Sequence, residues 1–251
     1  MKLLCVWVAL GLAFASPAIA LPAAETPTTP LTAFHLPDDY AKLTDAPLQA
    51  SLDPGVRMAG LSSGEFHGFP AWLVETPYAT AAISVFGGQL LSFVPKGGQD
   101  VLWLSALTKR QPEPIRGGTP VCWPYFAKMG QAGGMPSHGL VRTTAWHVRE
   151  AQREADGTVV LKLAPPTLAG LPLRLTMTLR IGRTLSQTLA TENIGDKPVV
   201  FTQALHIYFQ VGDVRKVTVA GLDGLTYLDK EDAGRSHVQH EIGRASCRER
   251  V

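Results

Sequence analysis

The sequence predicts an all-β protein built as one large antiparallel β-sandwich, and three observations support this fold class. Beyond Gly60, apolar and polar residues alternate with a period of two in several segments, as in strands with one buried face. Short turns rich in glycine, aspartate and asparagine separate these segments. No segment has the apolar spacing of an amphipathic helix of three turns. Strands without helices between them favour an antiparallel sandwich over a parallel sheet.

The clearest strand lies between Leu171 and Ile181, where large apolar residues alternate with polar ones. Gly87-Gly88 separates two apolar runs and is typical of a hairpin or a bulge. In chain order, the expected strands are Ala82–Ser84, Leu90–Val94, Val101–Leu104, Thr158–Leu163, Leu171–Ile181, Thr184–Thr191, Pro198–Val211 and Val214–Ala220.

Residues 1–20 are expected to be a signal peptide. Lys2 precedes an apolar run, and Ala18-Ile19-Ala20 fits the small-residue cleavage pattern, so the cut is predicted after Ala20. The apolar run is short for a membrane span. The sequence therefore predicts export, to a bacterial periplasm or beyond, with no stable membrane association after cleavage.

Two regions of different composition are expected to follow the signal peptide. Residues 21–59 comprise a flexible leader rich in proline, threonine and alanine and a poorly patterned approach segment. Residues 60–240 form the β-sandwich domain, which begins near Gly60. The formal net charge of +2 gives no reason to expect nucleic acid or an anionic membrane surface as a partner. The chain is expected to be a monomer.

The motifs of common cofactor and metal sites are not found in the sequence. It lacks a nucleophile elbow, a phosphate-binding loop of the Walker type and a dinucleotide fingerprint. His237 and His240 have a metal-like spacing only in a helix, and no third ligand accompanies them. Cys122 is the one cysteine expected within the fold, where a buried apolar role is commoner than a nucleophilic one. We therefore expect no cofactor and no metal.

The segment from Ile115 to Arg142 is the best candidate for a binding loop. Its glycines and prolines interrupt any helical or strand period, so an irregular backbone is expected. Arg116 and Arg142 would suit an anion, because each guanidinium can hold two oxygens of a phosphate or carboxylate. The alternative is a surface loop with solvated arginines and a structural histidine, His138.

The expected strand Pro198–Val211 carries a second candidate. One face of this strand is almost entirely apolar, whereas His206 and Tyr208 lie on the more polar face. A strand fixes the position of an acid–base group better than a loop does. His206 is therefore a candidate for proton transfer, and a solvent-facing histidine on an ordinary strand is the alternative.

Four stretches of the chain resemble the hexose-6-phosphate mutarotases (glucose-6-phosphate 1-epimerases), a branch of the aldose 1-epimerase superfamily. They are GGQLLSFVPKGGQDVLWLS at 87–105, PIRGGTPVCWPYFA at 114–127, SHGLVRTTAWHV at 137–148 and ALHIYFQVGDVRKVTVAGLDGLTYLDK at 204–230. They occur in family order, and the pairing of the RGG-x-P loop with HG-x-x-R is specific. The resemblance implies a galactose mutarotase-like β-sandwich with a sugar site on its concave face.

The resemblance also implies a role for each candidate residue. Arg116 and Arg142 would hold the substrate phosphate, His138 would line the site, Asp229 would bind the sugar, and His206 would be the general acid. Anomerisation requires an acid for the ring oxygen and a base for the anomeric hydroxyl, and a histidine and a carboxylate can supply them. The substrate implied is a sugar phosphate such as glucose 6-phosphate, with no cofactor.

The base of this family is a glutamate in a late strand, whereas similarity in this chain ends near His240. Residues 241–251, EIGRASCRERV, resemble the translation of a sequencing adapter, so a non-native tail and missing C-terminal strands are expected. The chain as written would then lack its base and have impaired activity. Two alternatives stay open: a non-catalytic exported carbohydrate-binding module and a mutarotase for unphosphorylated aldoses.

Overall fold

The computed structural model describes residues 2–8, 36, 38–50, 52, 54–128, 134–229, 232, 235–240 and 243–244. These residues are almost entirely strands and loops, which confirms the predicted all-β class. They contain one short α-helix, α1 (Tyr40–Thr44), and two 3-10 turns, η2 (Pro54–Val56) and η3 (Val214–Lys216). None of the helices in these ranges has the length and apolar character needed to cross a membrane.

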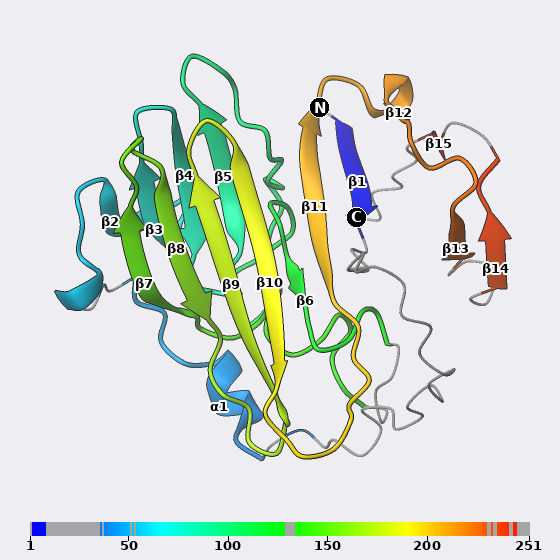
Figure 1. The fold of residues 1–251 in the computed structure, drawn as a ribbon, viewed down its shortest axis with the longest axis horizontal. Helices are drawn as coiled ribbons and strands as arrows, with labels where there is room; N and C mark the ends of the chain where they lie inside the picture. Colours follow the sequence, from blue (N-terminus) through cyan, green and yellow to red (C-terminus); the bar gives the residue numbers. More distant parts are fainter. Residues whose placement is uncertain are drawn as a thin grey trace, which may run out of the picture.

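Two four-stranded antiparallel sheets pack face to face (Figure 1). The first sheet has the order β2-β3-β4-β5 and the second the order β10-β9-β8-β7. Neighbouring strands in each sheet are consecutive in the sequence, so short turns join them. The strands are β2 (Leu61–Phe66), β3 (Phe69–Glu75), β4 (Ala79–Ser84), β5 (Leu90–Pro95), β7 (His147–Arg153), β8 (Val159–Ala164), β9 (Leu173–Ile181) and β10 (Leu185–Asn193).

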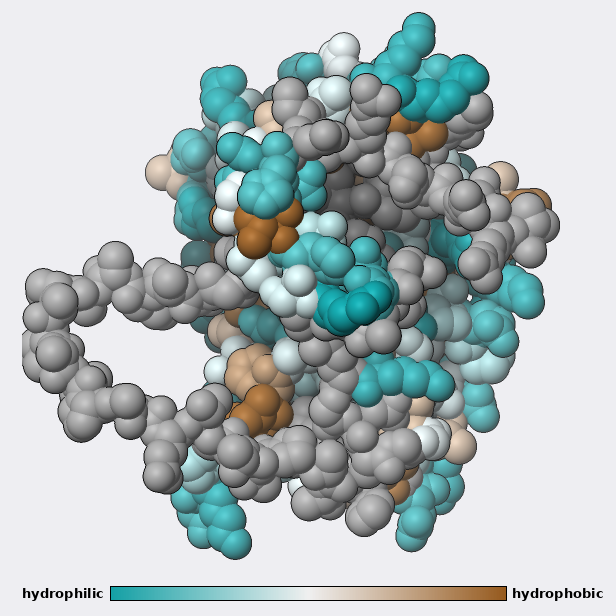
Figure 2. All heavy atoms as spheres, turned by 90° about the vertical axis from the view of Figure 1, so that its right-hand side faces the viewer, coloured by the Kyte–Doolittle hydropathy of each residue, from teal (hydrophilic) through white to brown (hydrophobic). Residues whose placement is uncertain are grey.

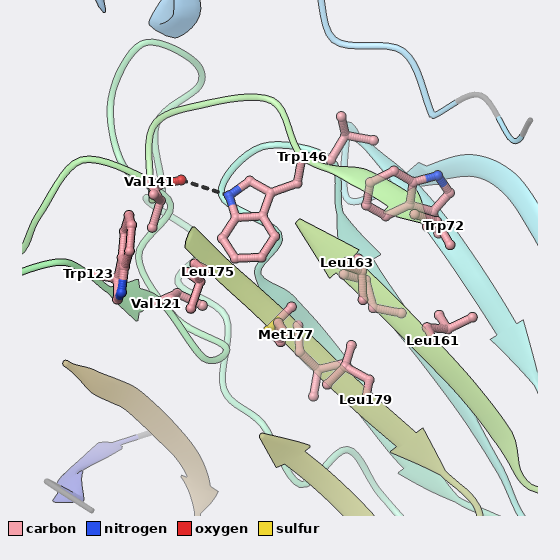
Figure 3. Packing of buried hydrophobic residues seen from close by; sticks show 14 of the residues in the cluster. Trp72, Val121, Trp123, Val141, Trp146, Leu161, Leu163, Leu175, Met177 and Leu179 are labelled. Atoms are coloured by element: carbon pink, nitrogen blue, oxygen red, sulfur yellow. Dashed lines mark hydrogen bonds between the residues drawn. The ribbon is translucent and has the colours of Figure 1, made fainter. Parts of the chain in front are cut away.

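The core lies between these sheets and follows from the alternation seen in the sequence (Figure 3). Along β9, Leu175, Met177 and Leu179 are fully buried and pack in one cluster with Leu161 of β8. Trp72 of β3 joins the same cluster from the other sheet. Truncating such a leucine to alanine typically costs roughly 2–5 kcal/mol, because it leaves a cavity in a close-packed interior. The predicted half-buried strand is therefore the structural centre of the sandwich.

A third sheet, with the order β1-β11-β6, continues from the edge of the first. It contains β6 (Val121–Cys122) and β11 (Ala204–Val211). Isolated bridges, Leu90↔Thr119 and Leu102↔Phe209, connect it to the neighbouring residues of β5 and the loop that follows. The prediction of a strand at Val101–Leu104 is wrong, because these residues form only single bridges and no continuous ladder.

Strand β11 begins at Ala204, later than the predicted start at Pro198. The preceding segment instead pairs irregularly with the loop after β6. The Thr202 N–H donates to the Pro124 carbonyl at 3.1 Å, and the Thr202 hydroxyl accepts from the Phe126 N–H at 2.8 Å. Hydrogen bonds of this irregular kind take the place of a continuous β-ladder before Ala204. The alternation of apolar residues therefore overestimates the length of the strand.

Strand β1 (Lys2–Val8) lies antiparallel to β11, with Lys2 opposite Val211 and Val8 opposite Leu205. This strand falls within the predicted signal peptide, whose remaining residues lie outside the described part of the chain. Cleavage after Ala20 would remove β1 and leave that edge of β11 without this partner. The signal peptide stays a prediction.

Two small strand pairs follow β11 in the sequence: β12 (Thr218–Val219) with β15 (Gly243–Arg244), and β13 (Thr226–Asp229) with β14 (Arg235–Val238). The predicted strand Val214–Ala220 is wrong over its first half. Residues Val214–Lys216 form the turn η3, because the Asp213 carboxylate accepts from the Arg215 N–H at 3.1 Å and caps it. Of the predicted tail, only Gly243 and Arg244 lie within the described residues.

Exposed apolar residues on the hairpin β13–β14 and the segment before it include Leu225, Tyr227 and Val238. Figure 2 views the molecule from this side, the right-hand side of Figure 1. Among the coloured residues, hydrophobic positions form separate spots within a largely hydrophilic surface. Scattered single apolar residues of this kind are normal for a protein surface and do not indicate a docking site.

The packed domain extends further towards the N-terminus than the predicted start near Gly60. Tyr40 of α1 and Val56 of η2 are buried in the main core. Leu43 and Leu48 are partly buried and pack against the same cluster. The approach segment has no regular period because its apolar residues contact the core one at a time, and such contacts leave no pattern in the sequence.

Candidate active site

Arg116, His138, Arg142 and His206 all line one cavity of about 760 Å³. The residues come from three separate parts of the chain: the loop before β6, the loop before β7, and β11. Lys109, Glu113, Ser137 and Tyr208 also line the cavity. The sequence-predicted grouping of two arginines with two histidines is therefore what the fold brings together.

His206 sits on β11, which is held by hydrogen bonds on the side of β6. The His206 N–H donates to the Pro120 carbonyl, and the Tyr208 N–H donates to the Gly118 carbonyl, both at 2.9 Å. The predicted division of the strand into two faces is confirmed. His206 and Tyr208 line the polar cavity, whereas Leu205 and Ile207 line a separate apolar hollow of about 690 Å³.

The imidazole of His206 is buried, with 8% of the residue exposed, so the alternative of a solvent-facing histidine is wrong. Burial and, to a smaller extent, the positive charge of Arg142 lower the pKa of His206 from 6.5 to about 4. Both effects disfavour the imidazolium. The imidazole of His206 is therefore neutral near pH 7.

Aromatic rings surround His206 on two sides. The Tyr208 ring stacks on it with centroids 4.7 Å apart, and Trp103 stacks on Tyr208 in turn at 6.0 Å. On another side the ring of His138 meets His206 edge-on at 5.9 Å, and Phe126 meets His138 edge-on at 5.1 Å. These contacts restrict the orientation of both imidazoles within the cavity.

His138 adopts a left-handed backbone conformation, with φ of 67°, which is uncommon for a residue with a side chain. Its N–H donates to the Ala127 carbonyl at 2.7 Å. Its Nδ1 accepts from the Ala127 N–H at 3.4 Å, so a neutral ring carries its proton on Nε2. His138 can therefore offer an N–H donor at Nε2 for a bound ligand.

The loop that carries Arg142 is fixed at several backbone positions. The Leu140 N–H donates to the Trp123 carbonyl at 2.8 Å, and the Trp146 indole N–H donates to the Val141 carbonyl at 2.9 Å (Figure 3). Gly139, with φ of 83°, lies where any Cβ would collide with the Trp123 carbonyl. The glycine of the HG-x-x-R pattern is thus required by close backbone approach.

Arg142 is half-buried, whereas Arg116 is exposed. Burial lowers the pKa of the Arg142 guanidinium, although an arginine remains charged in a protein. Charged groups taken partly out of water interact more strongly with a ligand, because solvent screens them less. Arg142 is therefore the stronger anchor for an anion, and Arg116 is a second cation at the cavity opening.

The position of Arg116 depends on the glycines that follow it. A Cβ on Gly117 would lie 2.5 Å from the Trp103 carbonyl oxygen, and one on Gly118 would collide with the Leu90 carbonyl. Both glycines have positive φ. The RGG pattern therefore lets the loop lie directly against the backbone of the first sheet, with Arg116 at the cavity.

Of the residues predicted for the site, Asp229 lies elsewhere, whereas Cys122 is buried as the sequence predicts. Asp229 belongs to the β13–β14 hairpin, opposite Arg235, and is not among the residues that line the cavity. Cys122 is fully buried on β6, and burial raises the pKa of its thiol to about 11. A buried thiol that stays protonated is not a nucleophile at neutral pH.

Sequence reasoning missed the contribution of the segment Leu107–Pro114 to the cavity. Its charged residues, Lys109 and Glu113, both line the opening. This segment has no strand period and no motif, so only its position directly before Arg116 could have drawn attention to it.

The model of the family described as Aldose 1-epimerase matches residues 70–241. The chain belongs to the aldose 1-epimerase family. This match runs from Pro70, the second residue of β3, to beyond the end of β14 and includes every residue predicted for the site.

The curated relatives carry a more specific name. A protein of Escherichia coli K12, provisionally named glucose-6-phosphate 1-epimerase, is 37% identical over 172 residues, which is 66% of this chain and 56% of the relative. A protein of Salmonella typhimurium with the same provisional name is 33% identical over 172 residues, with the same coverage. The chain thus spans a little over half the length of these curated relatives.

The fold of a solved family member is also similar. The crystal structure of YeaD from Salmonella typhimurium, provisionally described as a mutarotase, matches with a TM-score of 0.65 and 29% identity. The match covers 81% of this chain and 68% of that one. This likeness confirms the predicted mutarotase-like β-sandwich.

Proposed function

We propose that this protein interconverts the α and β anomers of a hexose 6-phosphate by acid–base opening of the sugar ring. The observation that carries the proposal is the placement of Arg116, Arg142, His138 and His206 on one cavity. The provisional names of the curated relatives support the same substrate class.

In this proposal, Arg116 and Arg142 bind the phosphate group of the substrate. A phosphate dianion placed between them would accept charge-assisted hydrogen bonds, with the half-buried Arg142 contributing most. Lys109 would add a third positive charge at the opening. An unphosphorylated sugar would leave these cations without an anion and would bind less tightly.

His206 is the proposed general acid for the ring oxygen. In the free cavity its pKa of about 4 makes the imidazole a weak base, partly because of Arg142. A bound phosphate dianion would neutralise Arg142 and raise the pKa of His206 towards the range in which acid catalysis is efficient. His138, with its proton on Nε2, would donate a hydrogen bond to a sugar oxygen.

The ring-opening reaction also needs a base at the anomeric hydroxyl. Glu113 is the one carboxylate among the described residues that line the cavity, and it lies in the same segment as Lys109 at the opening. We assign no described residue to the role of base. The acid and the phosphate-binding arginines are therefore the parts of the mechanism that these residues supply.

A sugar-phosphate-binding protein without catalysis is the second candidate. It is favoured by the cavity lining, because Glu113 is the one carboxylate among the described residues there and no base is assigned. Such a protein would need the phosphate-binding arginines and no base.

Exchange spectroscopy by NMR on glucose 6-phosphate and glucose tests the proposal, with calorimetry on the same ligands. The proposed enzyme speeds anomer exchange of glucose 6-phosphate more than that of glucose, and His206→Gln abolishes the effect. Because no described residue is assigned as the base, tight binding without faster exchange would favour the binding protein only if an added external base, such as imidazole, also fails to restore protein-dependent exchange. Equal exchange of both sugars, unaffected by Arg142→Ala, would indicate an aldose mutarotase instead.

A further inference from the structure

Helix α1 and the residues after it contact both loops that carry the cavity arginines. The helix lies outside residues 70–241, the range of the family match. Tyr40 at its start is buried, with 8% exposed, although the rest of the helix faces solvent or is half-buried. The N-terminal segment therefore lies where it can fix the position of these loops without lining the cavity itself.

The first contact fixes the loop of Arg142. The Tyr40 hydroxyl donates to the Leu140 carbonyl at 2.9 Å and lies 3.3 Å from the Thr143 hydroxyl. Leu140 and Thr143 lie on either side of Arg142 in the sequence, so one phenol oxygen ties together the short stretch that carries the guanidinium. Burial raises the pKa of the Tyr40 phenol, which keeps the hydroxyl protonated as a donor.

The second contact fixes the loop of Arg116. The Gln111 side-chain amide donates to the Thr44 carbonyl, at the end of α1, and to the Ala46 carbonyl at 3.0 Å. Carbonyls at a helix C-terminus have no partner within the helix, so they are available for such a contact. The side-chain amide of Gln111 satisfies two backbone acceptors at once.

Gln111 lies within a closed loop that ends at Arg116. The Arg116 N–H donates to the Thr108 hydroxyl at 2.8 Å, and the Ser105 N–H donates to the Arg116 carbonyl at 3.1 Å. The guanidinium of Arg110, next to Gln111, lies over the Phe69 ring at 4.4 Å from its centroid. A displacement of Gln111 would therefore move a loop whose closing residue is Arg116.

We infer that Tyr40 and Gln111 are positioning residues that, through α1, fix the spacing between Arg142 and Arg116 and so set the affinity for a phosphate ester. This inference rests on the proposed function. Neither side chain needs to touch the ligand. Each acts through the backbone of the loop that it holds, and the helix joins the two effects.

Calorimetry with glucose 6-phosphate and glucose tests the inference on the whole chain with Tyr40→Phe and Gln111→Met. Each variant deletes hydrogen bonds while keeping the size of the side chain. We expect each to weaken glucose 6-phosphate binding about five-fold, the effect of one lost net hydrogen bond. Glucose binding should stay unchanged, because a general loss of structure would weaken both ligands.

Double variants identify the route of the effect. Tyr40→Phe should have no further effect on glucose 6-phosphate binding in an Arg142→Ala background, and Gln111→Met none in an Arg116→Ala background. Tyr78→Phe is the matched control, because its hydroxyl also donates to a backbone carbonyl, that of Asp156 at 2.8 Å, on an exposed turn. This control should leave both affinities unchanged.

The outcomes separate the inference from the proposed function. A wild-type chain with no preference for glucose 6-phosphate over glucose overturns both. A wild-type preference that survives Tyr40→Phe and Gln111→Met overturns the positioning role alone. If Tyr40→Phe lowers the thermal midpoint so far that binding cannot be measured, Gln111→Met in its half-buried loop position still decides the question.

Discussion

The imidazole of His206 lies almost parallel to the phenol ring of Tyr208, with an interplanar angle of 9° and centroids 4.7 Å apart. The two residues are separated by one position on β11, so both point to the same face of the strand. The stacking contact restricts the rotation of the His206 imidazole. An acid that acts on a ring oxygen depends on such a fixed orientation.

Replacing Tyr208 by leucine should lower the rate of anomer exchange about ten-fold, because the stacking contact contributes up to roughly 1.5 kcal/mol. Tyr208→Phe keeps the ring and should retain most of the rate. The measurement is the exchange rate at saturating glucose 6-phosphate, with affinity followed by calorimetry. Equal loss in both variants would show that the hydroxyl, not the ring, is what matters.

The pKa of His206 should depend on Arg142. In the free protein we expect the imidazole to titrate near pH 4. Arg142→Ala removes a positive charge and should raise this pKa, although burial, the larger cause, should still keep it below 6.5. Titration of the imidazole carbon resonance by NMR measures both values. An unchanged pKa in Arg142→Ala would contradict the electrostatic link between the two residues.

His206 should also make the protein less stable in acid. Its pKa is about 4 in the folded state and 6.5 in the unfolded state, so unfolded chains bind more protons between these values. Folding stability therefore falls as the pH decreases from about 6.5 to 4, by about 3 kcal/mol from this residue. Urea unfolding at pH 7 and at pH 4 measures this loss of unfolding free energy. In His206→Asn the loss between the two pH values should be smaller than in the wild type by about 3 kcal/mol.

Gly139→Ala should disrupt the site through the backbone. The new Cβ would collide with the Trp123 carbonyl at a positive φ of 83°, so we expect a loss of at least about 3 kcal/mol. Gly97→Ala is the control, since its φ is 75° and nothing lies within 4 Å of an added Cβ. The control should cost only about 1–2 kcal/mol. Thermal unfolding of the two variants provides the comparison.

Arg142→Lys should weaken the binding of glucose 6-phosphate about ten-fold while keeping the charge, because an ammonium cannot hold two phosphate oxygens in a plane. Arg174→Lys is the matched control, because this arginine pairs with Glu192 on the exposed surface at 2.9 Å. Calorimetry at one fixed ionic strength should show no change for the control. Equal affinities for Arg142→Lys and wild type would argue against a two-oxygen contact.

The strands of the sandwich were predictable where one face packs on the core. The alternation of Leu171–Ile181 corresponds to β9, whose apolar residues are all buried. Strand β3 was missed, because both of its faces carry buried residues and no clean period of two appears. The turn η3 was missed because a single aspartate cap overrides the apolar residues around it.

The site was predictable where chemistry and spacing occur together in one loop or on one strand face. Arg116, Arg142, His138 and His206 meet at the cavity as the family resemblance implies, whereas Asp229 does not line it. The contacts of Tyr40 with Leu140 span 100 positions of sequence and have no local pattern. Gln111 is equally inconspicuous, because an isolated glutamine in a loop is common. Long-range hydrogen bonds of this kind require the folded structure.

One face of strand β11 lines the cavity, and the other lines the separate apolar hollow. Leu205, Ile207 and Phe209 alternate along it with His206 and Tyr208, so every side chain of one set is one residue away from the other. A change of size at Ile207 would tilt the strand and shift the imidazole without any contact with the sugar. Under the proposed function, the catalytic rate could therefore change through partly buried apolar positions of β11, and a search for improved variants limited to cavity residues would overlook them.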